Sequence, residues 1–339
     1  MAKKPQIIGG MFATGPVTGL SVKPPFWKGS VLALASARSG IRLVLECRQM
    51  KRIWLPSYLC GSIIDAAVAA NAEILFYEVD GCLLPESGGW LKNVERGDLV
   101  LFIDYFGFPA PEDLMRDAKD RGAVILEDAC QSLLSPPSEV SDYVLYSPRK
   151  YVGVSDGGIL ICRDGDPVAS ARLPRGSEDW MQNSLKAGER RAEFDRTGAE
   201  NGWFGLFREA EVHCPTEPYM MSDRAREVLF GYDYGTISEK RRENYRTLLR
   251  ALEGIALFPE LPDAIVPMGF PVAVEDRDRV RNRLFENRIY PPVHWPLYEI
   301  VPREYSASHR LAAKIMTIPC DQRYDFEDMM RIISILTHP

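Results

Sequence analysis

Short apolar runs alternate with helical patterns along the first half of the chain, and this alternation constrains the fold more than any other feature. The runs at 99–103, 123–126 and 143–146 are apolar throughout, and a helical stretch at 112–121 separates the first two. Strands of this kind are buried on both faces, as in parallel sheets that are covered by helices. The pattern therefore predicts an α/β fold with a large, mainly parallel sheet.

The composition is that of an ordinary globular chain, and it argues against several classes of function. A net charge of −6 offers no basic surface for nucleic acid, and no apolar run reaches the length of a membrane span. The seven cysteines are scattered without a C-x-x-C pair, and only four histidines are present. We therefore expect no metal site, no signal peptide and reduced thiols in a cytoplasmic protein.

The distribution of these signals predicts three regions. Residues 1–30 are rich in Gly and Pro and predict an N-terminal arm. Residues 31–235 carry the strand–helix units of a large domain, with a polar stretch at about 165–215 that fits a helical excursion or a lid. Its charged part, 189–196, fits a solvated helix better than a diphosphate clamp. Residues 236–339 predict a smaller α+β domain, and 339 residues are ample for both.

A long helix is expected to open the smaller domain. Thr236 and Glu239 form a capping-box pattern at its start, and the helix is expected to run to about Leu252. The further elements expected in this domain are a strand near 266–272 and helices at about 276–286 and 326–336.

Three stretches carry polar or reactive groups that suit the carboxyl ends of strands, where ligands bind in such sheets. Ser36-Ala37-Arg38-Ser39-Gly40 precedes a helical pattern, and a helix start suits a phosphate. Asp128 follows the run 123–126. Lys150 lies between two strands, ahead of Gly157-Gly158, and a lysine in a dry pocket readily attacks a carbonyl. Each stretch alone also fits a structural role, as a helix cap or a solvated lysine.

The order of these stretches resembles that of the fold-type I enzymes that use pyridoxal 5′-phosphate (PLP). More narrowly, the chain resembles the DegT/DnrJ/EryC1/StrS family of sugar aminotransferases, from about residue 30 to the C-terminus. The blocks that match family motifs in sequence order are 55–58, 104–107, 127–131, Lys150 with Gly157-Gly158, 219–222, 292–296 and 316–319.

The resemblance implies a role for each matching residue. The family's lysine before the Gly-Gly turn holds PLP as a Schiff base, which implies this role for Lys150. The family's acid pairs with the ring nitrogen, which implies Asp128, and Gln131 would contact the ring-hydroxyl side. The block before the first helix binds the phosphate, which implies Ala37 and Arg38.

Two departures from the family pattern concern the phosphate. The family's phosphate-binding serine corresponds to Ser147, which stands two residues closer to the lysine than usual, and Arg149 can replace a lost contact. An asparagine from the neighbouring subunit corresponds to Pro218, which has no N–H to donate.

Two further departures concern the ring and its surroundings. The aromatic residue that stacks on PLP corresponds to Cys60, and Tyr58 is the nearest aromatic residue. A family histidine corresponds to Asp104. The resemblance still implies a homodimer with the active site at the subunit interface, although we expect this site to be remodelled.

The resemblance implies an aminotransferase that takes an amino group from glutamate and passes it to a keto-sugar nucleotide, as in nucleotide-sugar biosynthesis. Its partners would be a small-molecule amino donor and a keto acceptor. His294 and Trp295 are expected to line the acceptor site, although the surrounding prolines also fit a rigid packed loop. Tyr105 is a further substrate candidate that also fits a core position.

Two alternatives stay open at this point. A PLP enzyme with another outcome, such as a dehydratase or lyase, would share these motifs, although the family's sugar dehydratases carry histidine where this chain has Lys150. A non-catalytic member with a binding or regulatory role is compatible with Pro218 and with the short spacing from Ser147 to Lys150.

Overall fold

A seven-stranded sheet forms the centre of the computed structural model, which describes residues 6–16, 18, 22–86, 88–163, 165–176 and 178–337. Its strands are β2 (Ser30–Leu34), β3 (Arg52–Pro56), β4 (Glu73–Tyr77), β5 (Leu99–Ile103), β6 (Val124–Asp128), β7 (Tyr143–Tyr146) and β8 (Gly158–Cys162). They lie in the order β2-β8-β7-β6-β5-β3-β4. β8 runs antiparallel to both of its neighbours, and the other neighbouring pairs are parallel.

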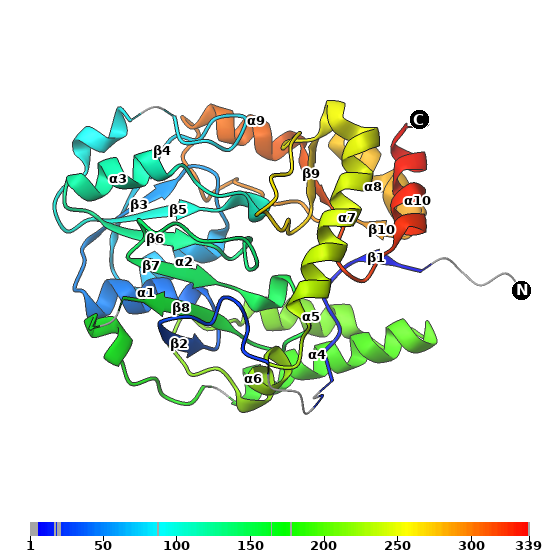
Figure 1. Ribbon diagram of the computed structural model, residues 1–339, viewed down its shortest axis with the longest axis horizontal. Coiled ribbons are helices and arrows are strands. Elements are labelled where there is room, and N and C mark those ends of the chain that lie inside the picture. Colours follow the sequence, from blue (N-terminus) through cyan, green and yellow to red (C-terminus); the bar gives the residue numbers. More distant parts are fainter. Residues whose placement is uncertain are drawn as a thin grey trace, which may run out of the picture.

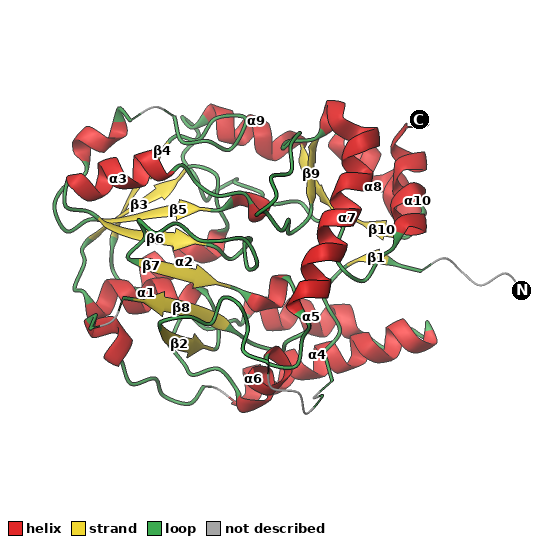
Figure 2. Cartoon of the chain, viewed as in Figure 1, coloured by secondary structure: helices red, strands yellow, loops and turns green. Residues whose placement is uncertain are grey.

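The central strands are buried because helices cover both faces of the sheet (Figures 1 and 2). All five residues of β5 and all four of β7 are buried, as expected from their continuous apolar runs. The helices that follow the early strands are α1 (Arg38–Cys47), α2 (Gly61–Ala69) and α3 (Glu112–Asp120). The prediction of an α/β fold with a mainly parallel sheet is confirmed.

A second core lies beside the sheet, on the right in Figure 1, and the C-terminal part of the chain supplies most of it. Its elements are α7 (Tyr234–Leu252), β9 (Phe270–Ala273), α8 (Arg277–Glu286), β10 (Ile289–Tyr290), α9 (Ser306–Lys314), β11 (Ile315–Ile318) and α10 (Phe326–Thr337). β9 and β11 pair antiparallel. The N-terminal strand β1 (Ile8–Gly9) joins this core, because Ile8 is fully buried and pairs with Ile289.

The polar stretch near 165–215 is largely helical. It contains α4 (Glu178–Thr197) and α5 (Trp203–Val212), which pack against each other, and α6 (Asp223–Leu229) follows. Among the described residues, short 3₁₀ turns connect other elements, namely η1 (Trp90–Asn93), η2 (Tyr105–Gly107), η3 (Pro148–Lys150), η4 (Pro167–Ser170) and η5 (Glu253–Ile255).

The predicted cap of α7 is wrong by three residues, because the helix is capped at Asp233 and not at Thr236. Asp233 caps the helix, because its carboxylate accepts hydrogen bonds from the N–H groups of Gly235 at 3.0 Å and Thr236 at 3.2 Å. Thr236 is already inside the helix and donates its hydroxyl to Asp233 at 2.7 Å. An aspartate is at least as good an N-cap as a threonine, so Asp233, which comes first in the sequence, is the N-cap residue.

Two features are absent from the described part of the chain. None of its helices combines the length and the apolar character needed to cross a membrane. No three His, Cys, Asp or Glu side chains of this part are grouped as a metal ion would need.

Candidate active site

Lys150 ends the short turn η3, just beyond the carboxyl end of β7. The next residue, Tyr151, is fully buried, and α7 holds it in place. The Tyr151 carbonyl accepts hydrogen bonds from Arg241 at 3.3 Å and from Gln322 at 2.7 Å, and the Arg241 guanidinium stacks 4.3 Å from the tyrosine ring. The backbone beside Lys150 is therefore tied to the second core.

Gly158 lets the lysine loop pack directly against the 36–40 block. A Cβ atom at Gly158 would lie 2.4 Å from the carbonyl carbon of Ser36, closer than real Cβ contacts come. The Gly157 N–H also donates to the Ala35 carbonyl at 2.7 Å. The Gly-Gly pair thus brings the start of α1 into contact with the loop that carries Lys150.

Lys150 lines a cleft of about 630 Å³, a size typical of small-molecule sites. His294 lines the same cleft, and its Nδ1 lies 2.8 Å from Thr317 Oγ1. Burial, and then the positive charge of Lys150, lower the pKa of His294 to about 3, so the ring is neutral at pH 7. Two of the predicted site residues, Lys150 and His294, therefore share one cleft.

Asp128 ends β6, and one of its oxygens accepts a hydrogen bond from the Cys130 N–H at 3.0 Å. The charges of Asp128 and Lys150 both affect the pKa of the Cys130 thiol. Burial raises the pKa of this thiol well above its usual range, Asp128 raises it further, and Lys150 opposes the rise. Asp128 pairs with Leu145 of the neighbouring parallel strand β7, and Lys150 follows β7, so the predicted acid and the predicted lysine lie at the same edge of the sheet.

Gln131 presents an unused donor in the same loop. The residue is 1% exposed, its Oε1 accepts a hydrogen bond from the Phe106 N–H at 2.9 Å, and its Nε2 is buried without a partner. A buried donor without an acceptor is destabilising, so an oxygen of a ligand would be stabilised at this point. Such an oxygen is what the sequence resemblance places beside Gln131.

Asp104 and Glu127 form a buried carboxyl pair behind Asp128. Both are 0% exposed. Burial, and next the charge of Glu127, raise the pKa of Asp104 well above its ordinary range. Burial raises the pKa of Glu127 as well, but hydrogen bonds from the Ser141 hydroxyl at 2.6 Å and from the Ser138 N–H at 3.0 Å oppose this rise, because they favour its charged form. Asp104 therefore holds the proton, an arrangement that no sequence pattern predicts.

The proposed phosphate residues lie around the start of α1. Ala37 is the N-cap residue, with no side chain that could cap the helix. Arg38 donates to the Cys214 carbonyl at 3.4 Å and lies 3.8 Å from Asp65. Ser147 is buried beside η3. None of these three lines the cleft of Lys150.

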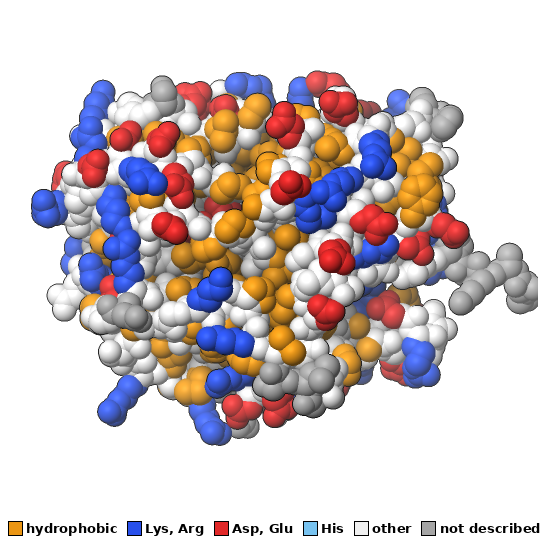
Figure 3. Space-filling view, in the orientation of Figure 1, with side chains coloured by type: hydrophobic (Ala, Val, Ile, Leu, Met, Phe, Trp, Pro, Cys, Tyr) orange, Lys and Arg blue, Asp and Glu red, His pale blue; other side chains and the backbone are white. Residues whose placement is uncertain are grey.

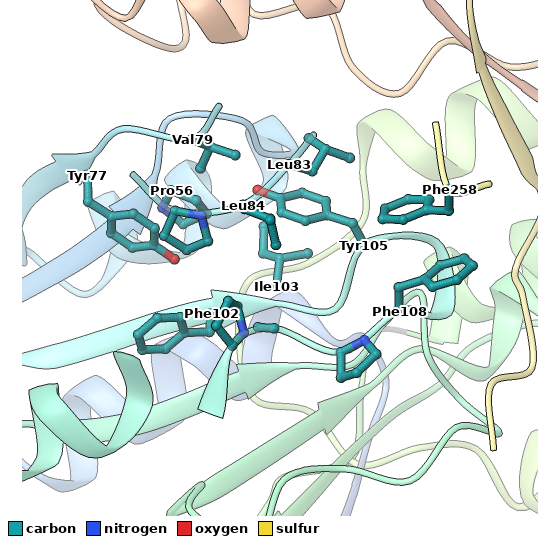
Figure 4. Close-up of a pocket in the computed structure, with 14 residues that line it drawn as sticks. Pro56, Tyr77, Val79, Leu83, Leu84, Phe102, Ile103, Tyr105, Phe108 and Phe258 are labelled. Atoms are coloured by element: carbon teal, nitrogen blue, oxygen red, sulfur yellow. The ribbon is translucent and has the colours of Figure 1, made fainter. Parts of the chain in front are cut away.

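Tyr58 and Tyr105 are packed inside the protein. Tyr58 is 0% exposed, its hydroxyl donates to the His294 carbonyl, and its ring lies 5.8 Å from that of Trp295. The Tyr105 hydroxyl donates to the Tyr58 carbonyl. Tyr105 also lines a separate apolar void of about 20 Å³ between the sheet and Phe258, shown in Figure 4. That void has room for about one water molecule, so it is no substrate site.

The cleft also contains residues that the sequence did not indicate. Arg191 of α4 is 2% exposed, stacks 4.6 Å from the Trp203 ring and has one amino group without a partner. This residue corrects the interpretation of 189–196 as a solvated helix, since the stretch is helical but Arg191 is buried. Phe194 and Trp203, which line the cleft beside Arg191, are the aromatic residues in the sequence that could have indicated this burial. In the space-filling view, apolar side chains gather toward the middle of the face and charged ones surround them (Figure 3).

Comparison with known proteins gives similarity in structure but not in sequence. No family model matches the chain, and no curated protein matches it. Among solved structures, the aminotransferase TlmJ from Streptoalloteichus hindustanus superposes with a TM-score of 0.68 at 17% identity, over 98% of each chain. The sugar aminotransferase CalS13 from Micromonospora echinospora gives 0.66 at 14% identity, over 98% of this chain and 99% of that one.

A third solved structure carries the family name in its description. A DegT DnrJ EryC1 StrS aminotransferase from Brucella abortus gives a TM-score of 0.65 at 17% identity, over 91% of this chain and 85% of that one. Similarity of this kind over nearly the whole chain establishes that the fold is the one that these aminotransferases share, the fold of fold-type I PLP-dependent transferases.

Proposed function

We propose that this chain is a PLP-dependent aminotransferase of the DegT/DnrJ/EryC1/StrS family and that Lys150 carries the cofactor. One observation supports the proposal above the others. Lys150 lies in a cleft of about 630 Å³, a size typical of small-molecule sites. Asp128 and Gln131 do not line the cleft, but the unpartnered Nε2 of Gln131 is a buried donor that suits a ring oxygen, so the donor set fits the cofactor.

When bound, PLP supplies a carbonyl that condenses with amines and a ring that withdraws electrons. The chain's own residues would do the rest. Lys150 Nζ would take the proton from the Cα of the amino donor and deliver it to C4′ of the cofactor. Asp128 would hold a proton on the ring nitrogen. His294, neutral because of its low pKa, would bind substrate without adding a second positive charge beside Lys150.

Glutamate is the proposed donor and a keto-sugar nucleotide the proposed acceptor. Two of the similar solved structures are described as sugar aminotransferases, and the cleft suits an anionic ligand with a flat group. Arg191 and Arg281 line the cleft, and Phe204 and Tyr290 are 53% and 40% exposed. Guanidinium groups bind phosphates, and aromatic side chains stack on flat rings.

We further propose that the protein acts as a homodimer in the cytoplasm. All seven cysteines are free thiols, which suits a reducing compartment. Val212, at the end of α5, leaves 77% of its surface exposed, which a second subunit could cover.

The proposal is tested by adding PLP to the purified protein and recording the absorbance band of lysine-bound cofactor. The band is expected in the wild type and in Lys92→Ala, in which an exposed lysine is lost, and is expected to be absent in Lys150→Ala. Glutamate should then remove the band and release 2-oxoglutarate in stoichiometric amount. If Lys150→Ala retains the band, or no donor removes it, the assignment is wrong.

A further inference from the structure

Three side chains around the start of α1 donate hydrogen bonds to one short segment, residues 211–215. Ser36 Oγ donates to the Pro215 carbonyl at 2.9 Å, and Arg38 donates to the Cys214 carbonyl at 3.4 Å. Arg149 Nη1 lies 2.5 Å from Glu211 Oε1. The donors that were expected to bind a phosphate are therefore engaged by the end of α5.

Glu211 brings a full negative charge to this place. The attraction of Arg149 lowers the pKa of Glu211, burial opposes this effect, and Arg38 and Lys150 lower the pKa further. The carboxylate is therefore charged at neutral pH. Only 37% of the Glu211 side chain is exposed, and 20% of that of Arg149.

The pairing leaves the arginine incompletely satisfied. Arg149 Nε is buried and has no hydrogen-bond partner. A guanidinium has five N–H donors in a planar fork and binds two oxygens of a phosphate side by side. A phosphate could therefore use a donor that the single contact with Glu211 does not.

We propose that Glu211 is a built-in competitor for the anion site of Arg38 and Arg149, which a phosphate group has to displace in order to bind. The N–H of Arg149 that Glu211 occupies cannot also serve a phosphate, and two negative charges against one guanidinium would repel each other. The competition concerns any phosphate. That the phosphate belongs to PLP is the one part of this inference that rests on the proposed function.

The position of Glu211 allows its carboxylate to move away from Arg149. It lies in the last turn of α5, next to Val212, which is 77% exposed, and to the exposed His213. A change of side-chain rotamer would take the carboxylate into water, where a charged group is well solvated.

The opposite role would be that Glu211 positions Arg149 to receive the phosphate. The two roles predict opposite effects of removing the charge. If Glu211 competes, Glu211→Gln tightens phosphate binding. If Glu211 positions Arg149, the same substitution weakens it.

The first experiment measures the binding of inorganic phosphate to the protein without cofactor, by calorimetry at constant ionic strength. Glu211→Gln is expected to bind phosphate about fivefold more tightly than the wild type, since a half-exposed ion pair is worth about 1 kcal/mol or less. Glu209→Gln is the matched control, because Glu209 lies on the same helix and is exposed, and it should bind as the wild type does. Unchanged or weaker binding by Glu211→Gln would overturn the proposal.

Arg149 provides a second comparison. Arg149→Gln should bind phosphate weakly, and Glu211→Gln should no longer improve binding when the two substitutions are combined. An improvement that persists without Arg149 would show that Glu211 acts through general charge, and the proposal would be wrong. Glu211→Ala should match Glu211→Gln, so the test does not depend on the folding of one variant.

The last comparison separates this inference from the proposed function. Glu211→Gln should tighten the binding of PLP, followed by absorbance, but leave that of pyridoxal, which lacks the phosphate, unchanged. If pyridoxal binding improves equally, the phosphate is not the group in competition. If PLP never forms a Lys150-dependent band while inorganic phosphate still distinguishes Glu211→Gln from Glu209→Gln, the proposed function fails and the competition stands.

Discussion

Asp104 and Glu127 are both fully buried at neighbouring strands, Asp104 directly after β5 and Glu127 near the end of β6. Because Asp104 is neutral, Glu127 is the only charged member of the pair and receives the hydrogen bonds of Ser138 and Ser141. The Asp104 N–H donates to the Asp128 carbonyl at 3.1 Å, so the pair is joined to the residue proposed as the acid of the site.

The first prediction concerns Asp104→Asn, which keeps the shape and the acceptor for the Ala110 N–H. A carboxyl whose pKa is raised on folding adds stability at low pH, and this contribution is lost as the pH rises through its folded-state pKa. The free energy of unfolding of the variant should therefore improve relative to the wild type as the pH rises, by up to about 1.4 kcal/mol per pH unit. Urea unfolding at pH 5 to 8 measures this.

The exposed Asp120→Asn is the control for this experiment, and its difference from the wild type should not change with pH. A constant destabilisation of Asp104→Asn at every pH would mean that Asp104 is charged in the folded protein.

The second prediction concerns acid unfolding and His294. The pKa of this ring is about 3 in the folded protein against 6.5 when solvated, so the unfolded chain binds the proton first. Stability is therefore lost as the pH falls from 6.5 toward 3. His294→Gln should reduce this loss, whereas substitution of the exposed His213 should not. Equal acid sensitivity of wild type and His294→Gln in urea unfolding would contradict the assignment.

The third prediction tests the close approach at Gly158. Gly158→Ala places a methyl group 2.4 Å from the Ser36 carbonyl carbon, and backbone has to move on one side. We expect a loss of about 1–3 kcal/mol in the free energy of unfolding, the usual effect of overpacking. Gly205→Ala is the matched control, because nothing lies within 4 Å of its added Cβ and the residue is inside α5. It should be neutral or slightly stabilising. Similar destabilisation of both variants would argue against the contact with Ser36.

The fourth prediction concerns Arg191, which joins α4 to the N-terminal arm. Its guanidinium donates to the Gly9 carbonyl at 3.3 Å and to Asp195 of the same helix at 2.8 Å. Arg191→Gln should lower the free energy of unfolding by about 1–3 kcal/mol, because the buried Gly9 carbonyl is left unpaired. It should also make the arm more sensitive to protease. Arg196→Gln, exposed on the same helix, should do neither. A variant with wild-type stability and an equally resistant arm would show that the buried guanidinium is dispensable.

Local sequence predicted those parts of the molecule that depend on neighbouring residues. The strands at 99–103 and 143–146 were found with correct bounds because a continuous apolar run reflects burial on both faces. The short strands β1 and β11 carried no such signal. β1 has only two residues, and its strand character comes from pairing with Ile289, which is far away in the sequence.

The site follows the same division. Lys150 and Asp128 were found because each stands in a short stretch whose order along the chain is informative. The pairing of Arg149 with Glu211 joins residues 62 positions apart, and the burial of Arg191 depends on Trp203 of the next helix. Neither contact leaves a periodic pattern, so only the folded arrangement reveals them.

The N-terminal strand also bears on how the protein is made. Ile8 pairs with Ile289, and the Gly9 N–H donates to the Tyr324 hydroxyl, 315 residues later. At a synthesis rate of about 5–20 residues per second, the arm leaves the ribosome tens of seconds before its partners exist. The central sheet can assemble during that interval, while the wall of the cleft formed by the arm has to wait. The site is therefore completed only when nearly the whole chain has been translated, so truncated chains should expose an open cleft.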